Sequence, residues 1–224
     1  MKEGICLVGT IDYLYLALED RLKRSGIKII SNPEDAKIKI GIDTDLPVDL
    51  LIIPPGIENK NAPLVITIHD LLIPDGHSKW SPSEIYLWLN QIKENKNIII
   101  ESQDVHYWVH LRDAVEAISM IISSENFRDC KGQLNICGRR AWSNNDVFIE
   151  LKMLWTRYYN SVNYAHTVES LSQIPNPVSR NRKEMRERPS LASLNLELLR
   201  AGGDGWHPLT PLRTGLMELL AQNP

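Results

Sequence analysis

The chain has 224 residues, of which 43% are hydrophobic and 24% are charged. These values are ordinary for a folded globular protein and exclude a disordered, collagen-like or coiled-coil chain. The length fits one domain, or one domain with a small addition. A formal net charge of −3 gives no general attraction to nucleic acid or to an anionic membrane surface.

The cysteines and the N-terminal residues indicate a cellular setting. Cys6, Cys130 and Cys137 cannot all pair within one chain, and a chain of this length can build a core without disulfides. Reduced thiols and a cytoplasmic location are the simplest interpretation. The first apolar run is interrupted at Gly9 and continues into helix-like sequence, so we expect neither a signal peptide nor a membrane-spanning segment.

The first hundred residues alternate between short apolar runs and segments with helical spacing. The apolar runs predict buried strands at 5–8, 27–30, 36–42, 50–53, 64–68 and 97–100. Helices are predicted over 11–25 and 82–93, the second with Ser81 as cap, Pro82 at its first position and Glu84 closing a capping box. Strands that are apolar on both faces indicate a mainly parallel sheet in an α/β fold. The third, fourth and fifth runs are separated by connections too short for crossover helices, so one helical layer is expected to be reduced.

The second half of the chain is mixed in character. A strand is predicted at 133–137, and helices are predicted at 110–123, 144–158, 194–200 and 211–221. Ser143 is the expected cap of the second of these helices. Residues 172–190 combine three prolines with many charges, which is typical of an irregular, exposed connection.

The order of these segments resembles the extended short-chain dehydrogenase/reductase family, the NAD-dependent epimerases and dehydratases of nucleotide sugars. The resemblance lies in W-V-H-L-R-D-A-V-E-A-I at 108–118, G-Q-L-N-I-C-G at 132–138 and G-W-H-P at 205–208. The branch of dTDP-4-dehydrorhamnose reductases looks nearest, on the strength of D-L-L-I-P-D-G at 70–76, the segment 82–94 and Arg188-Pro189. The motifs are short, and their common order makes the resemblance specific.

The resemblance implies a Rossmann-like, mainly parallel sheet with reduced crossover helices and a small C-terminal α/β substrate lobe. Residues 1–104 would form a degenerate dinucleotide-binding region, and residues 105–224 a mixed region that includes the lobe and a C-terminal helix. It further implies an NAD(P) cofactor near Gly9 and Thr10, and a nucleotide sugar as substrate. Related enzymes also suggest a homodimer through the helix at 81–94, with Trp88, Leu89 and Ile92 on an exposed face, or a heteromer with a related enzyme.

The glycine-rich turn of the family is altered in this chain. When Gly9 is aligned with the first glycine, Asp12 and Tyr15 stand at the second and third. A carboxylate beside a diphosphate is repulsive, and a tyrosine ring there would wedge the helix away from the sheet. Dinucleotide binding in the usual pose is therefore not expected, and a bound cofactor is expected only if the protein is an active enzyme.

The catalytic residues of the family are altered as well. Tyr86 matches the tyrosine of the Tyr-x-x-x-Lys pair, but Asn90 stands at the position of the lysine. Without a nearby cation the phenol should keep a pKa near its ordinary value of about 10, which suits acid–base work at neutral pH poorly. The serine or threonine that binds the substrate oxygen is replaced in this register by Ile68 and His69, of which only His69 could exchange a proton.

Other polar residues have two interpretations each. His69-Asp70, at the carboxyl end of a predicted strand, is either a new polar site or a turn cap with a satisfied histidine. His106 and His110 have a spacing that serves metals on helices, but the residues between them are typical of extended chain and no third ligand is evident, so no metal site is predicted. The cysteines lack an identifiable base and behave as small hydrophobic residues.

A run of cations lies in the irregular connection. Arg180, Arg182, Arg186 and Arg188 could hold the phosphates of a nucleotide sugar, because guanidinium groups match phosphate oxygens, or they could form an ordinary solvated loop.

These observations favour a degenerate epimerase/dehydratase-like protein without hydride transfer. It would bind a nucleotide or nucleotide sugar and act as a binding, scaffolding or regulatory protein. One alternative is an active NAD(P)-dependent nucleotide-sugar epimerase or reductase, with Tyr86 as the acid and His69 assisting. A second alternative is a structural interaction module without a ligand.

Overall fold

The computed structural model describes residues 3–57, 62–74, 79–80, 82–96, 100, 104–169 and 186–223. Its centre is a five-stranded sheet in the order β1-β2-β3-β4-β8, in which every neighbouring pair is parallel. The strands are β1 (Ile5–Gly9), β2 (Ile38–Ile42), β3 (Leu50–Ile53), β4 (Leu64–Ile68) and β8 (Gly132–Ile136). The α/β class and the parallel sheet expected from the apolar runs are confirmed.

Two short strand pairs extend beyond the sheet at its carboxyl edge. The parallel pair joins β5 (Leu71–Leu72) to β7 (Val109–His110). The antiparallel pair joins β6 (Val105–His106) to β9 (Trp142–Ser143). Together they bring residues 105–110 and 142–143 next to the segment that follows β4.

The predicted strand at 27–30 is wrong. Ile29 forms a single bridge with Ile5, and the chain then turns at Asn32, whose side chain accepts a hydrogen bond from the Glu34 amide at 3.1 Å. Pro33 follows in this turn and has no amide hydrogen to continue a ladder. Of the strand predicted at 97–100, residues 97–99 lie outside the described ranges, and Ile100 belongs to no strand.

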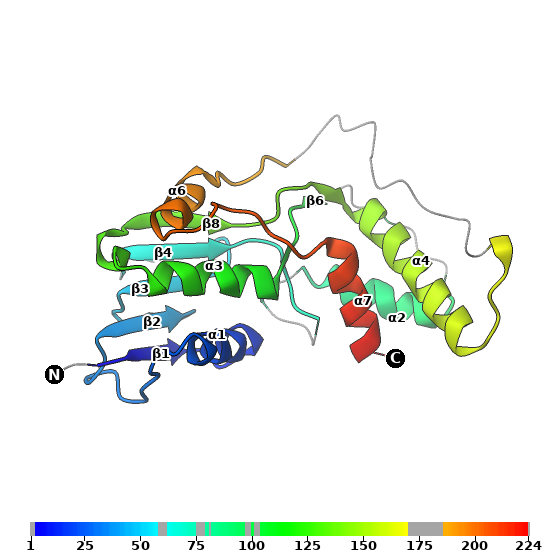
Figure 1. Cartoon of the computed structure of the whole chain (residues 1–224). Helices are drawn as coiled ribbons and strands as arrows, with labels where there is room; N and C mark the ends of the chain where they lie inside the picture. The colour runs from blue at the N-terminus through cyan, green and yellow to red at the C-terminus, as the bar shows by residue number, and fades with distance from the viewer. Residues whose placement is uncertain are drawn as a thin grey trace.

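Three helices cover one face of the sheet: α1 (Tyr13–Arg24), α3 (Leu111–Ser123) and α6 (Ala192–Arg200). Figure 1 shows α1 and α3 against the sheet and α6 beside β8. The strands direct side chains in register toward these helices, among them Ile42, Ile52 and Ile66, which are completely buried. Alternate strand residues thus build the main core together with the helices.

The opposite face of the sheet has a much smaller core. Its apolar cluster consists of strand and loop residues, with Leu51 and Ile53 buried against Val48 and with Ala62 packed alongside. No helix of the described residues contributes to this cluster. The reduced helical layer that the short connections predict is therefore confirmed, and loop side chains take its place.

A second core lies among α2 (Glu84–Lys93), α4 (Asn144–Val162) and α7 (Leu212–Gln222), at the right of Figure 1. The rings of Trp88 and Phe148 meet edge to face, with centroids 6.2 Å apart. Trp88, Leu89 and Ile92 are only 8%, 2% and 6% exposed, so the face expected to serve a dimer is covered by the protein's own helices. The expected exposure of these three residues is therefore wrong, whereas the homodimer through the 81–94 helix stays a prediction.

The ends of α2 and α4 differ in how well the sequence predicted them. Ser143 caps α4 as expected, since its side chain accepts from the Asp146 amide at 3.1 Å. The N-cap of α2 is Ser83, and its side chain makes no capping hydrogen bond. The predicted cap, Ser81, lies outside the described residues. The helix begins at Glu84, two residues after the predicted first helical position.

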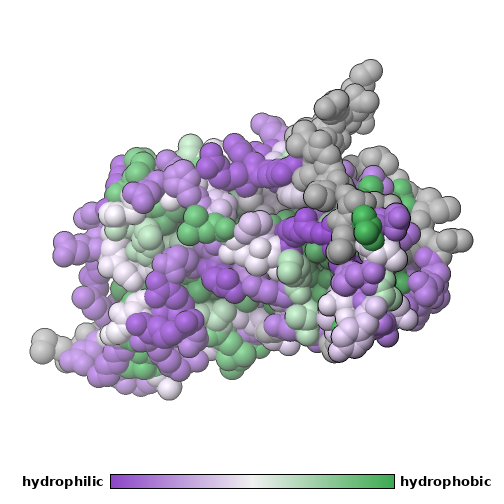
Figure 2. Space-filling model, turned by 45° about the vertical axis from the view of Figure 1, so that its right-hand side comes forward, coloured by the Kyte–Doolittle hydropathy of each residue, from purple (hydrophilic) through white to green (hydrophobic). Residues whose placement is uncertain are grey.

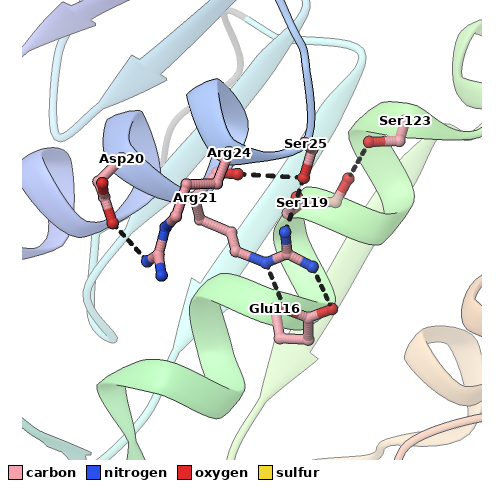
Figure 3. Close-up of polar contacts among 7 residues, drawn as sticks. All are labelled: Asp20, Arg21, Arg24, Ser25, Glu116, Ser119 and Ser123. Atoms are coloured by element: carbon pink, nitrogen blue, oxygen red, sulfur yellow. Dashed lines mark hydrogen bonds and ion pairs between the residues drawn. The ribbon is translucent and has the colours of Figure 1, made fainter.

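Polar contacts also join α1 to α3 (Figure 3). The Arg21 guanidinium donates to both carboxylate oxygens of Glu116, at 2.5 and 2.7 Å, and to the Ser25 hydroxyl at 2.7 Å. Arg24 pairs with Asp20 on the same helix. These side chains are one third or more exposed, so both ion pairs add little to stability. Only the pair of Arg21 and Glu116 joins the two helices.

The molecular surface is mostly polar. Figure 2 shows hydrophilic side chains over most of the visible face, with smaller apolar patches between them. In the described part of the chain, no helix combines the length and the apolar character needed to cross a bilayer.

The C-terminal segment is held at β8 by Trp206, which yields a prediction. Its buried indole donates to the Cys137 carbonyl at 2.9 Å, so Trp206→Phe should lower the free energy of unfolding by about 1–3 kcal/mol through the unsatisfied carbonyl. Trp155→Phe is the matched control, because this half-buried indole packs against Tyr158 and Tyr159. Urea denaturation of both variants measures the difference, and equal losses would contradict the role of the hydrogen bond.

Candidate functional site

The carboxyl ends of β4 and β8 lie side by side and carry a chain of hydrogen bonds. His69 follows β4, and its Nε2 lies 2.9 Å from Asn135 Oδ1 on β8. The Asn135 amide nitrogen donates onward to the Ser190 carbonyl at 3.4 Å, so its oxygen faces His69 as an acceptor. His69 Nε2 is therefore the donor in this pair, and Nδ1 is buried without a hydrogen-bond partner in the described structure.

Asp70 is the most connected residue of this edge. It is 6% exposed and has a left-handed backbone, with φ of 50°. Its carboxylate accepts from His106 Nδ1 at 3.0 Å and from the Tyr107 amide at 2.8 Å. Arg186 Nη1 lies 3.1 and 3.2 Å from the two oxygens. Asp70 thus joins the end of β4 to β6 and to the segment at 186.

The environment of Asp70 keeps it ionised. Burial by itself raises the pKa of the carboxyl group, but the hydrogen bonds from His106 and the Tyr107 amide, with the positive charge of Arg186, outweigh it. The net result is a pKa below the ordinary value of 3.8. A permanent negative charge at this point holds Arg186 in place.

A close backbone contact completes the link between β8 and residues 107–108. The Gly138 amide donates to the Tyr107 carbonyl at 2.7 Å. A Cβ atom at Gly138 would lie 2.1 Å from the Trp108 carbonyl oxygen, so only glycine fits here.

Several cations surround this edge. Arg188 donates to the Arg139 carbonyl at 3.2 Å, and the Arg139 guanidinium lies 3.1 Å from His207 Nδ1. The Arg140 guanidinium stacks 4.6 Å from the Trp142 ring centroid. Of the arginines predicted to bind phosphate, Arg186 and Arg188 therefore belong to this edge. Arg180 and Arg182 lie outside the described residues.

Gly9 and Thr10, the predicted cofactor residues, lie at the end of β1. A Cβ atom at Gly9 would be 2.2 Å from the Ile42 carbonyl oxygen, and φ is 112°, so the glycine permits close approach of β1 to β2. The Thr10 amide donates to the same carbonyl at 2.9 Å. Lys79 donates to the Thr10 hydroxyl at 3.4 Å and pairs with Asp43.

The N-terminus of α1 is capped from within the chain. Asp12 Oδ1 accepts from the Tyr15 amide at 3.0 Å, and Oδ2 accepts from the indole of the buried Trp80 at 2.7 Å. A carboxylate of the chain itself thus occupies the helix end, which in general attracts anions.

The expected wedge at Tyr15 is not found. Leu14, Leu18 and Leu22 are fully buried, so α1 packs closely on the sheet. The Tyr15 hydroxyl donates to the carbonyl of Leu7 on β1 at 3.4 Å.

Tyr86 lies on α2 in the second core. It is 6% exposed, and its hydroxyl donates to the Ile73 carbonyl at 2.6 Å. Lys93, the next cation along the helix, donates to the Asn223 carbonyl at the end of α7. His69 and Tyr86 are therefore hydrogen-bonded to different partners, His69 to Asn135 and Tyr86 to a backbone carbonyl.

The paired histidines bind separate carboxylates. His106 contacts Asp70, whereas His110 Nε2 lies 3.0 Å from Glu218. Burial lowers the pKa of His110, whose Nδ1 accepts from the Arg112 amide and caps α3. Within the described ranges, no group of three or more His, Cys, Asp or Glu side chains is arranged to hold a metal ion.

Cys137 lies beside the edge as a neutral thiol. It is completely buried, and burial together with the negative charge of Asp70 raises its pKa to about 12. A thiol in this state is a poor nucleophile near neutral pH.

Three residues of this edge were missed from the sequence: His106 as the partner of Asp70, Asn135 as the partner of His69, and Arg139 as a cation. Arg139 follows directly on a predicted strand, and that position was a usable signal, because the carboxyl ends of parallel strands share one edge. The pairing of His106 with Asp70 joins residues 36 positions apart and had no local signal.

Among known proteins, only solved structures resemble this chain. The sequence matches no protein-family model and no curated protein. UDP-glucose 4-epimerase from Thermotoga maritima, solved with UDP-glucose, has a TM-score of 0.59 at 11% identity over 98% of each chain. dTDP-glucose 4,6-dehydratase from Bacillus anthracis, solved with NAD, has 0.61 at 11% identity over 99% of this chain and 96% of the other. A dTDP-4-dehydrorhamnose reductase from Clostridium acetobutylicum has 0.53 at 12% identity over 97% and 98%.

These likenesses establish the fold. The chain has an α/β Rossmann-like fold with a five-stranded parallel sheet, similar over nearly its whole length to the structures of this epimerase, this dehydratase and this reductase. The expected fold class is therefore confirmed.

The electrostatics of Asp70 give a prediction on pH. Because its pKa is lowered on folding, its stabilising effect is present above about pH 4 and is lost as the pH falls through the folded-state value. Asp70→Asn should cost about 2–4 kcal/mol of unfolding free energy at pH 7 and progressively less below pH 4. Asp20→Asn, at a carboxylate whose side chain is 61% exposed, should have a small effect throughout. A loss for Asp70→Asn that is constant with pH in denaturant titrations would contradict this account.

Proposed function

We propose that this protein binds a nucleotide or nucleotide sugar on an epimerase/dehydratase-like frame and does not transfer hydride. The observation that carries the proposal is the Asp12 carboxylate at the N-terminus of α1, held by Trp80. A diphosphate at that helix end would meet a like charge and would have to displace the indole. The dinucleotide, which hydride transfer requires, is therefore disfavoured in its usual pose.

The carboxyl edge of β4 and β8 supports binding of a phosphate-bearing ligand. Arg186 and Arg188 stand there with Arg139, and guanidinium groups bind phosphate oxygens in a fork. Asp70 neutralises part of the charge of Arg186, while the Arg186 side chain stays 39% exposed. This edge is also where parallel α/β sheets place their ligands. The structurally similar epimerase solved with UDP-glucose supports this proposal in the kind of ligand.

Calorimetric titration tests the proposal directly. NADH and NADPH should give no one-to-one binding, whereas one member of a panel of UDP-, dTDP- and GDP-sugars should bind. Arg188→Met should weaken that binding about tenfold or more, because a charged hydrogen bond is lost. Arg128→Met is the matched control, since Arg128 is exposed and precedes β8 at the opposite edge of the sheet.

The titration has two contrary outcomes. Tight one-to-one binding of a dinucleotide would contradict the interpretation of Asp12 and would restore the enzyme alternative. No response to any sugar nucleotide would leave an interaction module without a ligand.

Tyr86→Phe separates a structural tyrosine from a catalytic one. Its hydroxyl is bonded to the Ile73 carbonyl, so the variant should lose about 1 kcal/mol of stability and bind the sugar nucleotide as the unaltered chain does. Turnover of a nucleotide sugar with NAD(P) that is present in the unaltered chain and absent in Tyr86→Phe would favour the enzyme alternative. Denaturation, calorimetry and a coupled absorbance assay at 340 nm supply the three readouts.

A further inference from the structure

A groove between α4 and α7 lies apart from the sheet edge. Its volume is about 510 Å³, and its lining comes from residues 154–166 and 213–221. This volume falls within the range of about 300–1,000 Å³ typical of small-molecule sites. In Figure 1 the two helices lie side by side at the right of the molecule.

One part of the groove is apolar. Leu154 and Leu220 are almost fully buried and form its base, while Met217 is 53% exposed at the rim. Tyr158 adds an aromatic wall, and its ring lies 5.7 Å from that of Trp155. An apolar ligand tail laid over this surface would remove it from water, which is favourable in proportion to the area covered.

The other part of the groove carries two guanidinium groups. Arg157 and Arg213 line it together with His166, and none of the described lining residues carries a carboxylate. Guanidinium groups bind carboxylate and phosphate oxygens, so this part of the lining favours a negatively charged ligand group.

Arg213 is held in position by Glu150. The guanidinium lies 3.3 Å from Glu150 Oε1, and the Glu150 side chain is only 6% exposed whereas that of Arg213 is 40% exposed. Glu150 is not among the lining residues. A cation anchored on one side and open on the other is a pre-organised binding group, which lowers the entropic cost of binding an anion.

We propose that the groove between α4 and α7 binds an amphipathic organic anion, with its charged head at Arg157 and Arg213 and its apolar tail over Leu154, Met217 and Leu220. The Ser161 and Tyr158 hydroxyls supply further hydrogen-bonding groups in the same lining. The groove shares no residue with the carboxyl edge of the sheet, so this site is independent of the proposed nucleotide site.

Octyl phosphate is the probe, titrated by calorimetry below its micellar concentration into the full-length protein. We expect one-to-one binding, with 1-octanol and inorganic phosphate each bound about tenfold more weakly or worse, because each lacks one half of the recognition.

Met217 and Leu196 offer a matched pair of variants. They are 53% and 47% exposed, so substitution should leave the fold intact, as thermal unfolding would verify. Met217→Glu places a carboxylate under the apolar tail and should weaken octyl phosphate about tenfold or more, because that charge would be desolvated by the tail. Leu196→Glu makes the same change on α6, outside the groove, and should bind as the unaltered chain does.

Three results would overturn the proposal: no binding of octyl phosphate, equal binding of 1-octanol, or equal affinity of the Met217→Glu and Leu196→Glu variants. None of these depends on the sugar-nucleotide titration, so failure of one proposal leaves the other standing.

Discussion

The carboxylate of Asp70 is the interaction on which the carboxyl edge of the sheet depends. It is buried, yet it is ionised, because a histidine, a backbone amide and an arginine converge on it. A buried charge is tolerated only when its hydrogen-bonding capacity is satisfied, so the three partners and the left-handed backbone at Asp70 must form together. Residues that are far apart in sequence, at 70, 106 and 186, thereby acquire fixed positions at one point.

A second carboxylate, that of Asp12, satisfies a backbone amide of α1 just after the end of β1. The first turn of α1 has unpaired amides that attract an anion, and Asp12 supplies that anion from within the chain. Trp80 then covers the carboxylate, and Lys79 joins Thr10 to Asp43 across the neighbouring strand ends. At the carboxyl edge of the sheet, the part next to β1 is thus covered by side chains of the chain itself. The part next to β4 and β8 keeps partly exposed guanidinium groups.

The reduced helical layer explains where the second core lies. With short connections between β2, β3 and β4, loop residues such as Val48 cover the far face of the sheet. The helices α2, α4 and α7 instead pack on one another beyond the carboxyl edge. Their contact buries Trp88, and it also leaves the groove with Arg157 and Arg213 along its side.

Sequence patterns predicted the local structure well where one signal dominated. The runs at 50–53 and 64–68 became β3 and β4, and Ser143 caps α4. The run at 27–30 is also mostly apolar but pairs at only one residue, because Asn32 and Pro33 turn the chain away. Trp88 was assigned to an exposed face because periodicity identifies an apolar face and does not identify what covers it.

The sequence by itself determined the α/β class, the parallel strands, the missing crossover helices and the replacement of glycines by Asp12 and Tyr15. The first three of these follow from composition or spacing within a short window, and the replaced glycines follow from alignment with the motif of the family that the chain resembles. Only the tertiary structure decided that Asp12 is paired with Trp80, that Asp70 holds His106 and Arg186, and that Tyr86 is bonded to a carbonyl. These contacts join residues 13 to 116 positions apart, and the free energy of such pairs depends on burial and distance, which a linear pattern does not contain.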